Sequence, residues 1–405
     1  MVSDLQSIYS ANAKGMQRSA IRELLKLTAQ PDIISFAGGL PAPESFPIDD
    51  LREVITEVMT NEPTRALQYG PTEGDSLLQE ELIKHYNREG MNLKKENILI
   101  TTSSQQGLDL VAKIFFDRGD KAIVGLPTYL GGLGAFNSYG ADLVGVELDE
   151  HGMRPDHLEE ELKRLHAKGE KPKFIYIIPD FQNPAGITMP RERRLEIIDI
   201  AKRYNQLIIE DSPYRELRFE GEPVPWLNAL DNEGNVLTLG TFSKIFLPGF
   251  RLGWAIGHAS LIDKLVVAKQ SVDLCAPPFN QRVAGRFLQK GYLEKNIAKI
   301  IGMYREKRDI MLAGFREHMP EEVTWTEPEG GLFLFLTAPE YIDMGELFPK
   351  ALEKKVAFVL GSAFYCNGGG KNTARINFSF STIEQIVEGV KRLASVLKEA
   401  IANHK

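Results

Sequence analysis

The chain has 405 residues, 43% of them hydrophobic, which is enough for a substantial core and, we expect, two domains. A formal net charge of −7 argues against nucleic-acid binding, which needs a clustered basic face, and no run approaches the roughly 18 apolar residues of a membrane span. The two cysteines, Cys275 and Cys366, are far apart, so we expect reduced thiols in a cytoplasmic protein and no metal site.

The first part of the chain, residues 1–70, lacks the alternation of strand and helix patterns that is typical of a parallel sheet. We expect it to form an arm and part of a small domain. Residues 71–300 are expected to form a large domain, because apolar strand-like runs alternate with helical patterns. The predicted helices include 105–116, 155–167 and 190–204. The predicted strands are 97–102, 121–126, 142–148, 173–178, 206–210, 236–239 and 252–256. This order predicts an α/β fold whose mostly parallel, seven-stranded sheet is covered by helices on both faces.

The sequence pattern changes in the last part of the chain. A helical pattern runs from residue 260 to about 318, and strand-like runs follow near 323–326, 331–336, 356–360 and 373–380. Residues 301–405 are therefore expected to form most of a smaller α+β domain.

Lys244 is the most informative residue among the polar motifs that follow the predicted strands. It comes directly after Ser243, close to Thr241, and precedes Arg251. A lysine beside hydroxyl groups and an arginine suits a residue that holds an aldehyde cofactor covalently while its neighbours bind the cofactor's phosphate. Alone, a lysine after a serine is also ordinary surface chemistry, so the interpretation depends on the other motifs.

A pyridine ring in such a cofactor makes further demands. Asp211 ends an apolar run and could keep the ring nitrogen protonated, whereas strand alternation points Glu210 to the opposite face. Asn183 and Tyr214, each beside a proline, offer hydrogen-bond donors to a ring hydroxyl, and Tyr129 offers an aromatic neighbour for the ring face. For each of these residues, an ordinary turn or packed loop residue remains the alternative.

Two more sets of residues are candidates for binding a negatively charged part of a ligand. Ser104 and Gln105 stand where a predicted strand passes into a helix, so their amides could bind a phosphate, although a serine there is also a good helix cap. Arg375 lies among apolar and small residues of a predicted strand and suits a bidentate contact with a substrate carboxylate. A structural salt bridge is the alternative for Arg375.

Taken together, these motifs resemble the class I/II aminotransferases, which are pyridoxal-phosphate enzymes of fold type I. The resemblance runs from Ile33-Ile-Ser-Phe-Ala-Gly-Gly-Leu-Pro41 to Arg375-Ile-Asn-Phe378. It implies that catalysis depends on Lys244, Asp211 and Tyr129. It implies that the cofactor is bound by Ser104, Gln105, Tyr129, Asn183, Asp211, Tyr214, Thr241, Ser243, Lys244 and Arg251. It implies that the substrate is bound by Arg375, Gly39 and Asn183.

The same resemblance implies an assembly and a subgroup. Tyr69, in Leu67-Gln-Tyr-Gly-Pro71, matches a tyrosine that reaches the phosphate of the neighbouring subunit, so a homodimer with shared sites is expected. The segments Arg18–Leu27, Phe36–Pro43 and Gln68–Gly74 are most similar to the 2-aminoadipate and kynurenine aminotransferases. That similarity implies that Ser19 and Arg22 meet an acidic substrate side chain, although Arg22 could equally be a helix-surface residue.

The expected reaction is a ping-pong transfer of an amino group from an L-amino acid to a 2-oxo acid, with 2-oxoglutarate as the expected acceptor. The expected donors are of the 2-aminoadipate, aromatic, glutamate or branched-chain type. A β-lyase or a carbon–carbon bond-forming synthase on the same scaffold is the first alternative, because one fold can carry several reactions of this cofactor. A ligand-sensing transcription regulator is the second. We expect no room for its N-terminal DNA-binding domain, because the residues that match the aminotransferase pattern already begin near Ser19.

Overall fold

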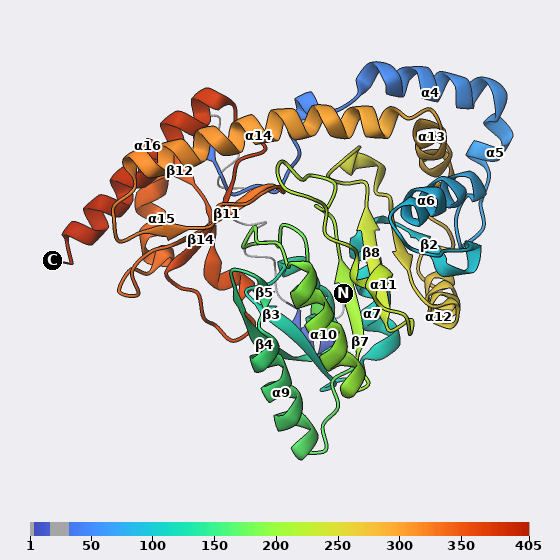
Figure 1. The fold of residues 1–405 in the computed structure, drawn as a ribbon, viewed down its shortest axis with the longest axis horizontal. Coiled ribbons are helices and arrows are strands. Elements are labelled where there is room, and N and C mark those ends of the chain that lie inside the picture. Colours follow the sequence, from blue (N-terminus) through green and yellow to red (C-terminus); the bar gives the residue numbers. More distant parts are fainter. Residues whose placement is uncertain (1–3, 17–31, 405) are drawn as a thin grey trace.

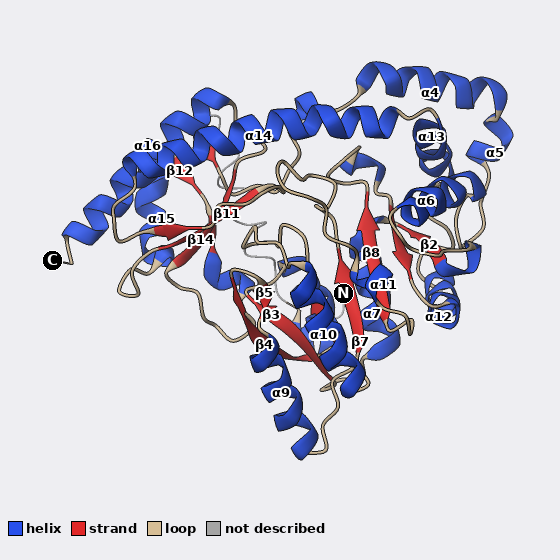
Figure 2. Ribbon diagram, in the orientation of Figure 1, coloured by secondary structure: helices blue, strands red, loops and turns tan. Residues whose placement is uncertain are grey.

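The computed structural model describes residues 4–16 and 32–404, which form an α/β fold with a large sheet, a smaller sheet and a two-stranded one (Figures 1 and 2). The order of the large sheet is β2-β9-β8-β7-β6-β3-β4-β5. Its strands are β2 (Ile98–Thr101), β3 (Lys121–Leu126), β4 (Asp142–Asp149), β5 (Gly152–Met153), β6 (Phe174–Ile177), β7 (Leu207–Asp211), β8 (Val236–Thr241) and β9 (Gly253–Ile256). Strand β9 is antiparallel to both its neighbours and β5 is antiparallel to β4, whereas the other pairings are parallel.

The predicted mostly parallel sheet is confirmed, and all seven predicted strands are present. The predicted number is one short, because the chain turns back after β4 and Gly152 pairs with Asp149 as the start of β5. Gly152 has a φ of +91°, which a glycine adopts without strain. A strand of two residues has no alternating pattern by which the sequence could reveal it.

Both faces of the large sheet are covered by helices. Alternate side chains go to opposite faces: Val124 and Ile209 pack with one group of helices, and Ile123 and Ile208 with the other. The first group is α7 (Ser103–Phe115), α8 (Leu130–Ser138) and α12 (Ala259–Gln270). The second is α9 (Pro155–Ala167), α10 (Arg191–Arg203) and α11 (Leu227–Leu230). Burial on both sides explains why these strands are continuous apolar runs.

The smaller sheet is antiparallel, with the order β10-β11-β14-β13. Its strands are β10 (Thr324–Trp325), β11 (Phe333–Thr337), β13 (Val359–Leu360) and β14 (Thr373–Asn377). The prediction of one strand over 356–360 is wrong. Strand β12 (Val356–Ala357) instead pairs in parallel with β1 (Ile34–Ser35), and only the residues after Phe358 join β14. The chain passes from one sheet to another at Phe358, and a continuous apolar run does not reveal such a transfer.

The remaining helices surround these sheets. Two short N-terminal helices, α1 (Leu5–Ile8) and α2 (Ala11–Gly15), precede α4 (Ile48–Asn61), α5 (Pro63–Leu67) and α6 (Ser76–Arg88). Helices α4, α5 and α6 pack against α13 (Pro278–Gln289). The long helix α14 (Tyr292–His318) then extends from α13 to α16 (Ile383–Ala402) beside the smaller sheet, where α15 (Met344–Glu353) also lies (Figure 1).

Short 3-10 turns complete the described chain: η1 (Pro43–Ser45), η2 (Lys95–Asn97), η3 (Pro248–Phe250) and η4 (Gly361–Phe364). Within the described residues, no helix is long and apolar enough to cross a membrane. Strands β2, β3, β6, β7 and β8 run in the same direction, so the polar segments after them leave the same edge of the large sheet. This is the edge where open α/β sheets bind ligands.

Candidate active site

Lys244 follows β8 and reaches across to the N-terminal loop. Its Nζ donates a hydrogen bond of 2.7 Å to the carbonyl oxygen of Gly39. Burial, together with the nearby positive charges of Arg375 and Arg251, lowers the pKa of Lys244 to about 8. The amine is therefore partly neutral near pH 7 to 8, which is the state in which it can attack an aldehyde or take up a proton.

Asp211 is the last residue of β7 and is 1% exposed. Its Oδ2 accepts a hydrogen bond of 2.7 Å from the hydroxyl of Tyr176, whereas its buried Oδ1 has no hydrogen-bond partner among the described residues. Burial raises the pKa of Asp211 to about 6. A buried carboxylate oxygen without a donor is suited to a cationic ring nitrogen, so this residue fits pyridoxal phosphate.

The neighbouring carboxylate lies on the opposite side of the sheet. Glu210 accepts hydrogen bonds from the backbone N–H of Leu227, from that of Asn228 and from the hydroxyl of Thr238. The predicted separation of Glu210 and Asp211 is confirmed. Burial raises the pKa of Glu210, and the positive charge of Arg194 together with the hydrogen bonds from Thr238 and Leu227 offsets part of that effect.

A chain of hydrogen bonds joins three of the predicted residues. Asn183 Nδ2 donates to the hydroxyl of Tyr214 at 3.1 Å, and Arg375 Nη1 donates to Asn183 Oδ1 at 3.0 Å. The Asn183–Pro184 peptide bond is cis. Burial raises the pKa of Tyr214, so its phenol is protonated and able to donate. Strands from the two sheets therefore bring these side chains into one cluster.

Arg375 is buried between two aromatic rings. Its guanidinium carbon lies 4.2 Å from the ring centre of Phe333 and 5.2 Å from that of Phe364. Its Nη2 donates to the carbonyl oxygen of Ala37 at 2.9 Å, and its buried Nε has no hydrogen-bond partner among residues 4–16 and 32–404. Burial lowers the pKa of Arg375 to about 10. None of the described groups that accept a hydrogen bond from Arg375 is a carboxylate, so its charge is available to an anionic ligand.

The N-terminal turn of α7 and the loop after β8 lie side by side and make a cradle that could hold an anion. Helix α7 begins at Ser103, and Ser104 and Gln105 follow in its first turn, where backbone N–H groups lack helical acceptors. Arg251 Nη2 donates to Ser103 Oγ at 2.5 Å. Thr241 Oγ1 donates to Ser243 Oγ at 2.9 Å. The sequence interpretation missed Ser103, although the run of hydroxyl residues at 101–104 was its signal.

The cradle depends on a close approach of two backbones at Gly253. A Cβ at this position would lie 2.6 Å from the Ser103 carbonyl carbon and from the Ser104 nitrogen. We expect Gly253→Ala to displace the turn and to weaken pyridoxal phosphate binding by about tenfold or more, because such a backbone shift costs about 1–3 kcal/mol. Gly249→Ala is the matched control, because nothing lies within 4 Å of its Cβ position. Absorbance titration with the cofactor measures both, and equal dissociation constants would contradict the prediction.

Tyr129 stands at the start of α8 and contacts the same helix turn. Its hydroxyl donates to Gln105 Oε1 at 3.4 Å, and Gln105 Nε2 donates to the carbonyl oxygen of Gly131 at 2.9 Å. A Cβ on Gly131 would lie 2.4 Å from the Tyr129 ring, so the glycine makes room for this orientation. Tyr129 and Gln105 therefore lie together at the candidate phosphate end of the site.

One further predicted residue, Tyr69, lies on the surface of the chain, where it is 80% exposed. Ser19 and Arg22 lie outside the described residues. Conversely, the sequence interpretation missed Tyr176, the partner of Asp211, although a single hydroxyl in the apolar strand β6 was a signal for it.

Comparisons with known proteins agree with this geometry. The family model "Aminotransferase class I and II" matches residues 32–393. The chain is 47% identical to an aromatic-amino-acid aminotransferase of Thermococcus litoralis, covering 98% of this chain and 95% of that protein. It is 40% identical to a 2-aminoadipate transaminase of Thermus thermophilus, covering 97% of each.

Among solved structures, a kynurenine aminotransferase of Pyrococcus horikoshii superimposes with a TM-score of 0.96 at 46% identity, covering 98% of this chain and 99% of that one. That protein was crystallised with PMP, the amino form of pyridoxal phosphate. The agreement extends over the whole described fold, from the large sheet to the smaller one. The chain belongs to the class I and II aminotransferases, and its cofactor is pyridoxal 5′-phosphate.

Proposed function

We propose that this aminotransferase takes aromatic amino acids and 2-aminoadipate as donors and 2-oxoglutarate as acceptor. The names of the relatives at 47% and 40% identity support these two donor classes. The aromatic surroundings of Arg375, formed by Phe333 and Phe364, support an apolar or aromatic substrate near the carboxylate-binding group. A β-lyase is not favoured, because these relatives are transaminases.

The observation that carries the proposed roles is the buried Oδ1 of Asp211, which has no hydrogen-bond partner in the part of the chain that the structure describes. We assign Asp211 to the ring nitrogen of the cofactor, where its negative charge keeps that nitrogen protonated. Pyridoxal phosphate supplies an aldehyde that takes up the amino group and a ring that accepts the electron pair left at the substrate's α-carbon. Lys244 Nζ removes the α-proton, a task for which a pKa of about 8 is suited.

The remaining residues position the reactants. Asn183 and Tyr214 are assigned to the ring hydroxyl, and their 3.1 Å hydrogen bond supports a common target. Ser104, Gln105, Thr241, Ser243 and Arg251 are assigned to the phosphate. Arg375, with Gly39 and Asn183 beside it, is assigned to the substrate carboxylate. Tyr129 is assigned to the face of the ring.

The test is a single half-reaction without acceptor. We expect L-phenylalanine or L-2-aminoadipate to convert the bound cofactor to its amino form, seen as a shift of its absorbance band, with release of the matching 2-oxo acid. We expect Arg375→Lys to raise the KM for either donor by about 10- to 100-fold, because a bidentate contact is lost. If both donors leave the band unchanged while other amino acids shift it, the substrate proposal is wrong but the aminotransferase activity stands.

We also propose a homodimer with shared sites. An exposed apolar surface supports it: Leu67, Tyr69, Val272 and Leu274 are 66%, 80%, 47% and 48% exposed. Leu67 ends α5 and Tyr69 follows it, and this segment meets the one that carries Val272 and Leu274 where Gly70 approaches Pro278.

Light scattering is expected to give twice the chain mass for the wild type and a smaller mass for Leu67→Glu, because a charge would be buried at the interface. Val387→Glu, at an exposed apolar residue on α16, is the control that should remain dimeric. A dimeric Leu67→Glu variant would exclude this surface as the dimer interface.

We further propose a cytoplasmic location, which the two separate free cysteines support.

A further inference from the structure

A buried carboxylate, Asp180, lies just before Asn183 and is not part of the cluster that would meet the cofactor. It is 1% exposed, and Arg194 Nη2 donates to its Oδ1 at 2.7 Å. The side chain of Arg194 is fully buried on α10, and its other hydrogen bonds go to the carbonyl oxygens of Met189, Pro225 and Pro179. Asp180 is therefore the acidic partner that this buried guanidinium requires.

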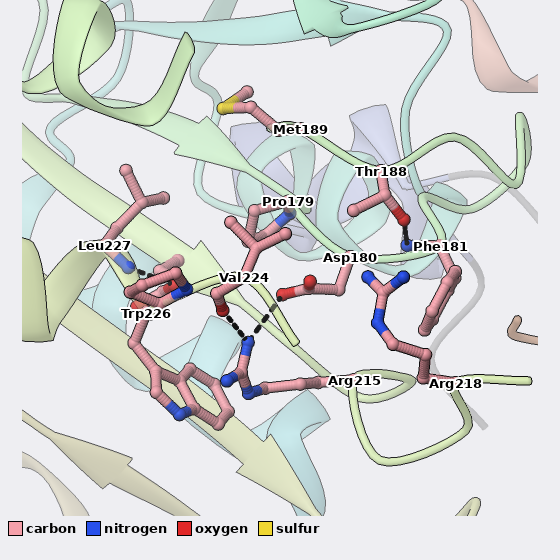
Figure 3. A network of polar contacts seen from close by, with 12 residues as sticks. Pro179, Asp180, Phe181, Thr188, Met189, Arg215, Arg218, Val224, Trp226 and Leu227 are labelled. Carbon is pink, nitrogen blue, oxygen red and sulfur yellow. Dashed lines mark hydrogen bonds and ion pairs between the residues drawn. The ribbon is translucent and has the colours of Figure 1, made fainter. Parts of the chain in front are cut away.

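A second arginine approaches the same carboxylate from the loop that carries Tyr214. Arg215, the next residue after Tyr214, lies with Nη1 3.7 Å from Asp180 Oδ2 (Figure 3). Its guanidinium also bonds Glu89 at 3.2 Å and stacks 4.3 Å from the ring centre of Trp226. Asp180 thus links the segment before Asn183 to the segment after Tyr214.

The loop between these anchors has a conformation that needs support. Phe181 has a φ of +48°, a left-handed backbone conformation that is strained for a non-glycine residue. Its backbone N–H is 3.3 Å from the hydroxyl of Thr188, and the guanidinium of Arg218 lies 4.8 Å from its ring centre (Figure 3). A Cβ on Gly330 would lie 2.4 Å from the Phe181 ring, so the glycine leaves the space that the ring occupies. Contacts from outside the loop therefore maintain its shape.

We propose that Asp180 is a positioning residue that holds Asn183 and Tyr214 together through Arg194 and Arg215. The two side chains are 3.1 Å apart although 31 positions separate them in the chain, so their spacing depends on what joins their loops. The inference rests on the proposed roles of Asn183 and Tyr214 as donors to the ring hydroxyl. When the spacing is lost, the donors no longer stabilise the ionised ring oxygen together.

The experiment uses the cofactor-loaded protein and measures the pH at which the visible absorbance of the bound cofactor changes. We expect Asp180→Asn to raise this midpoint by about one pH unit, because the ionised form loses hydrogen bonds. We also expect the rate at which the cofactor dissociates to rise by about tenfold or more, measured by dialysis against free phosphate. Arg215→Met should give a shift in the same direction, and Arg215→Lys, which keeps the charge, a smaller one.

Asp149→Asn is the matched control. Asp149 forms a bidentate ion pair with Arg193, the residue beside Arg194 on α10, and its other hydrogen bond is to the backbone of His151. This variant loses an ion pair to the same helix, one more exposed than the pair of Asp180 and Arg194, and should keep the wild-type midpoint. If the pH midpoints of both Arg215→Met and Asp180→Asn equal that of the wild type, the inference is overturned. If Asp180→Asn does not fold, the midpoint of Arg215→Met alone decides. A wild-type protein that shows no such band with pyridoxal phosphate would instead overturn the roles assigned to the cluster.

Discussion

Replacement of Lys244 by alanine is expected to abolish transamination, lowering kcat by about 10⁴-fold or more, because both the covalent anchor and the proton-transferring amine are lost. The amine lies 2.7 Å from the carbonyl oxygen of Gly39 and 6.0 Å from the ring centre of Tyr214. Transfer from L-phenylalanine to 2-oxoglutarate measures the loss. The fold should persist, because the lysine side chain is not part of the apolar core.

Two controls separate this role from a general effect of removing a lysine. Lys264→Ala removes an exposed lysine on α12 and should leave kcat unchanged. Borohydride reduction of the cofactor-loaded wild type should attach the cofactor irreversibly to Lys244, which peptide mass spectrometry detects. Near-normal turnover in Lys244→Ala would contradict the assignment.

Asp211→Asn is expected to have opposite effects on activity and on stability. The asparagine cannot supply the negative charge assigned to the ring nitrogen, so kcat should fall by about 10²- to 10³-fold. Without cofactor, however, the wild-type carboxylate is buried and its Oδ1 has no hydrogen-bond partner among the described residues. The cofactor-free variant should therefore be more stable than the cofactor-free wild type at pH 8.

The direction of the pH dependence follows from the raised pKa. The pKa of Asp211 is about 6 in the folded chain, against 3.8 in its ordinary state. The proton that the folded state binds more tightly stabilises the wild type below pH 3.8, and this stabilisation is lost as the pH rises to about 6. Above that pH the variant should be favoured by on the order of 3 kcal/mol, measured by urea unfolding.

Glu210→Gln is the control for the effect of Asp211→Asn on activity, because this neighbouring carboxylate faces α11 on the other side of the sheet. Its activity should change far less than that of Asp211→Asn. Equal losses in the two variants would show that Asp211 acts through the fold rather than through its position at the site. A cofactor-free Asp211→Asn that is no more stable than the wild type would contradict the burial argument.

The fold was predictable where the chain carries strong patterns. Strands such as β6 and β7 are buried on both faces and read as unbroken apolar runs. The prediction failed where no pattern exists, in the two-residue strand β5, and where one run serves two sheets, at Phe358. Both failures concern pairings between strands, which depend on segments elsewhere in the chain.

The candidate site was predictable to the extent that its residues follow strand ends. The motifs at Asn183, Asp211 and Lys244 lie at one edge of the sheet because their strands are parallel. Ser103 and Tyr176 were missed, since their significance comes from Arg251 and Asp211 across the site. Neither partnership follows from local sequence.

The sequence by itself determined the fold class, the family resemblance and the chemical types of the candidate residues, because these depend on local periodicity and on motifs at the ends of strands. Only the tertiary structure decided which groups meet. Within residues 4–16 and 32–404, it leaves one oxygen of Asp211 without a donor, encloses Arg375 between two aromatic rings and joins Asp180 to two arginines. The reason is that burial and pairing depend on residues brought together from distant parts of the chain, and these set the pKa values and orientations on which the chemistry depends.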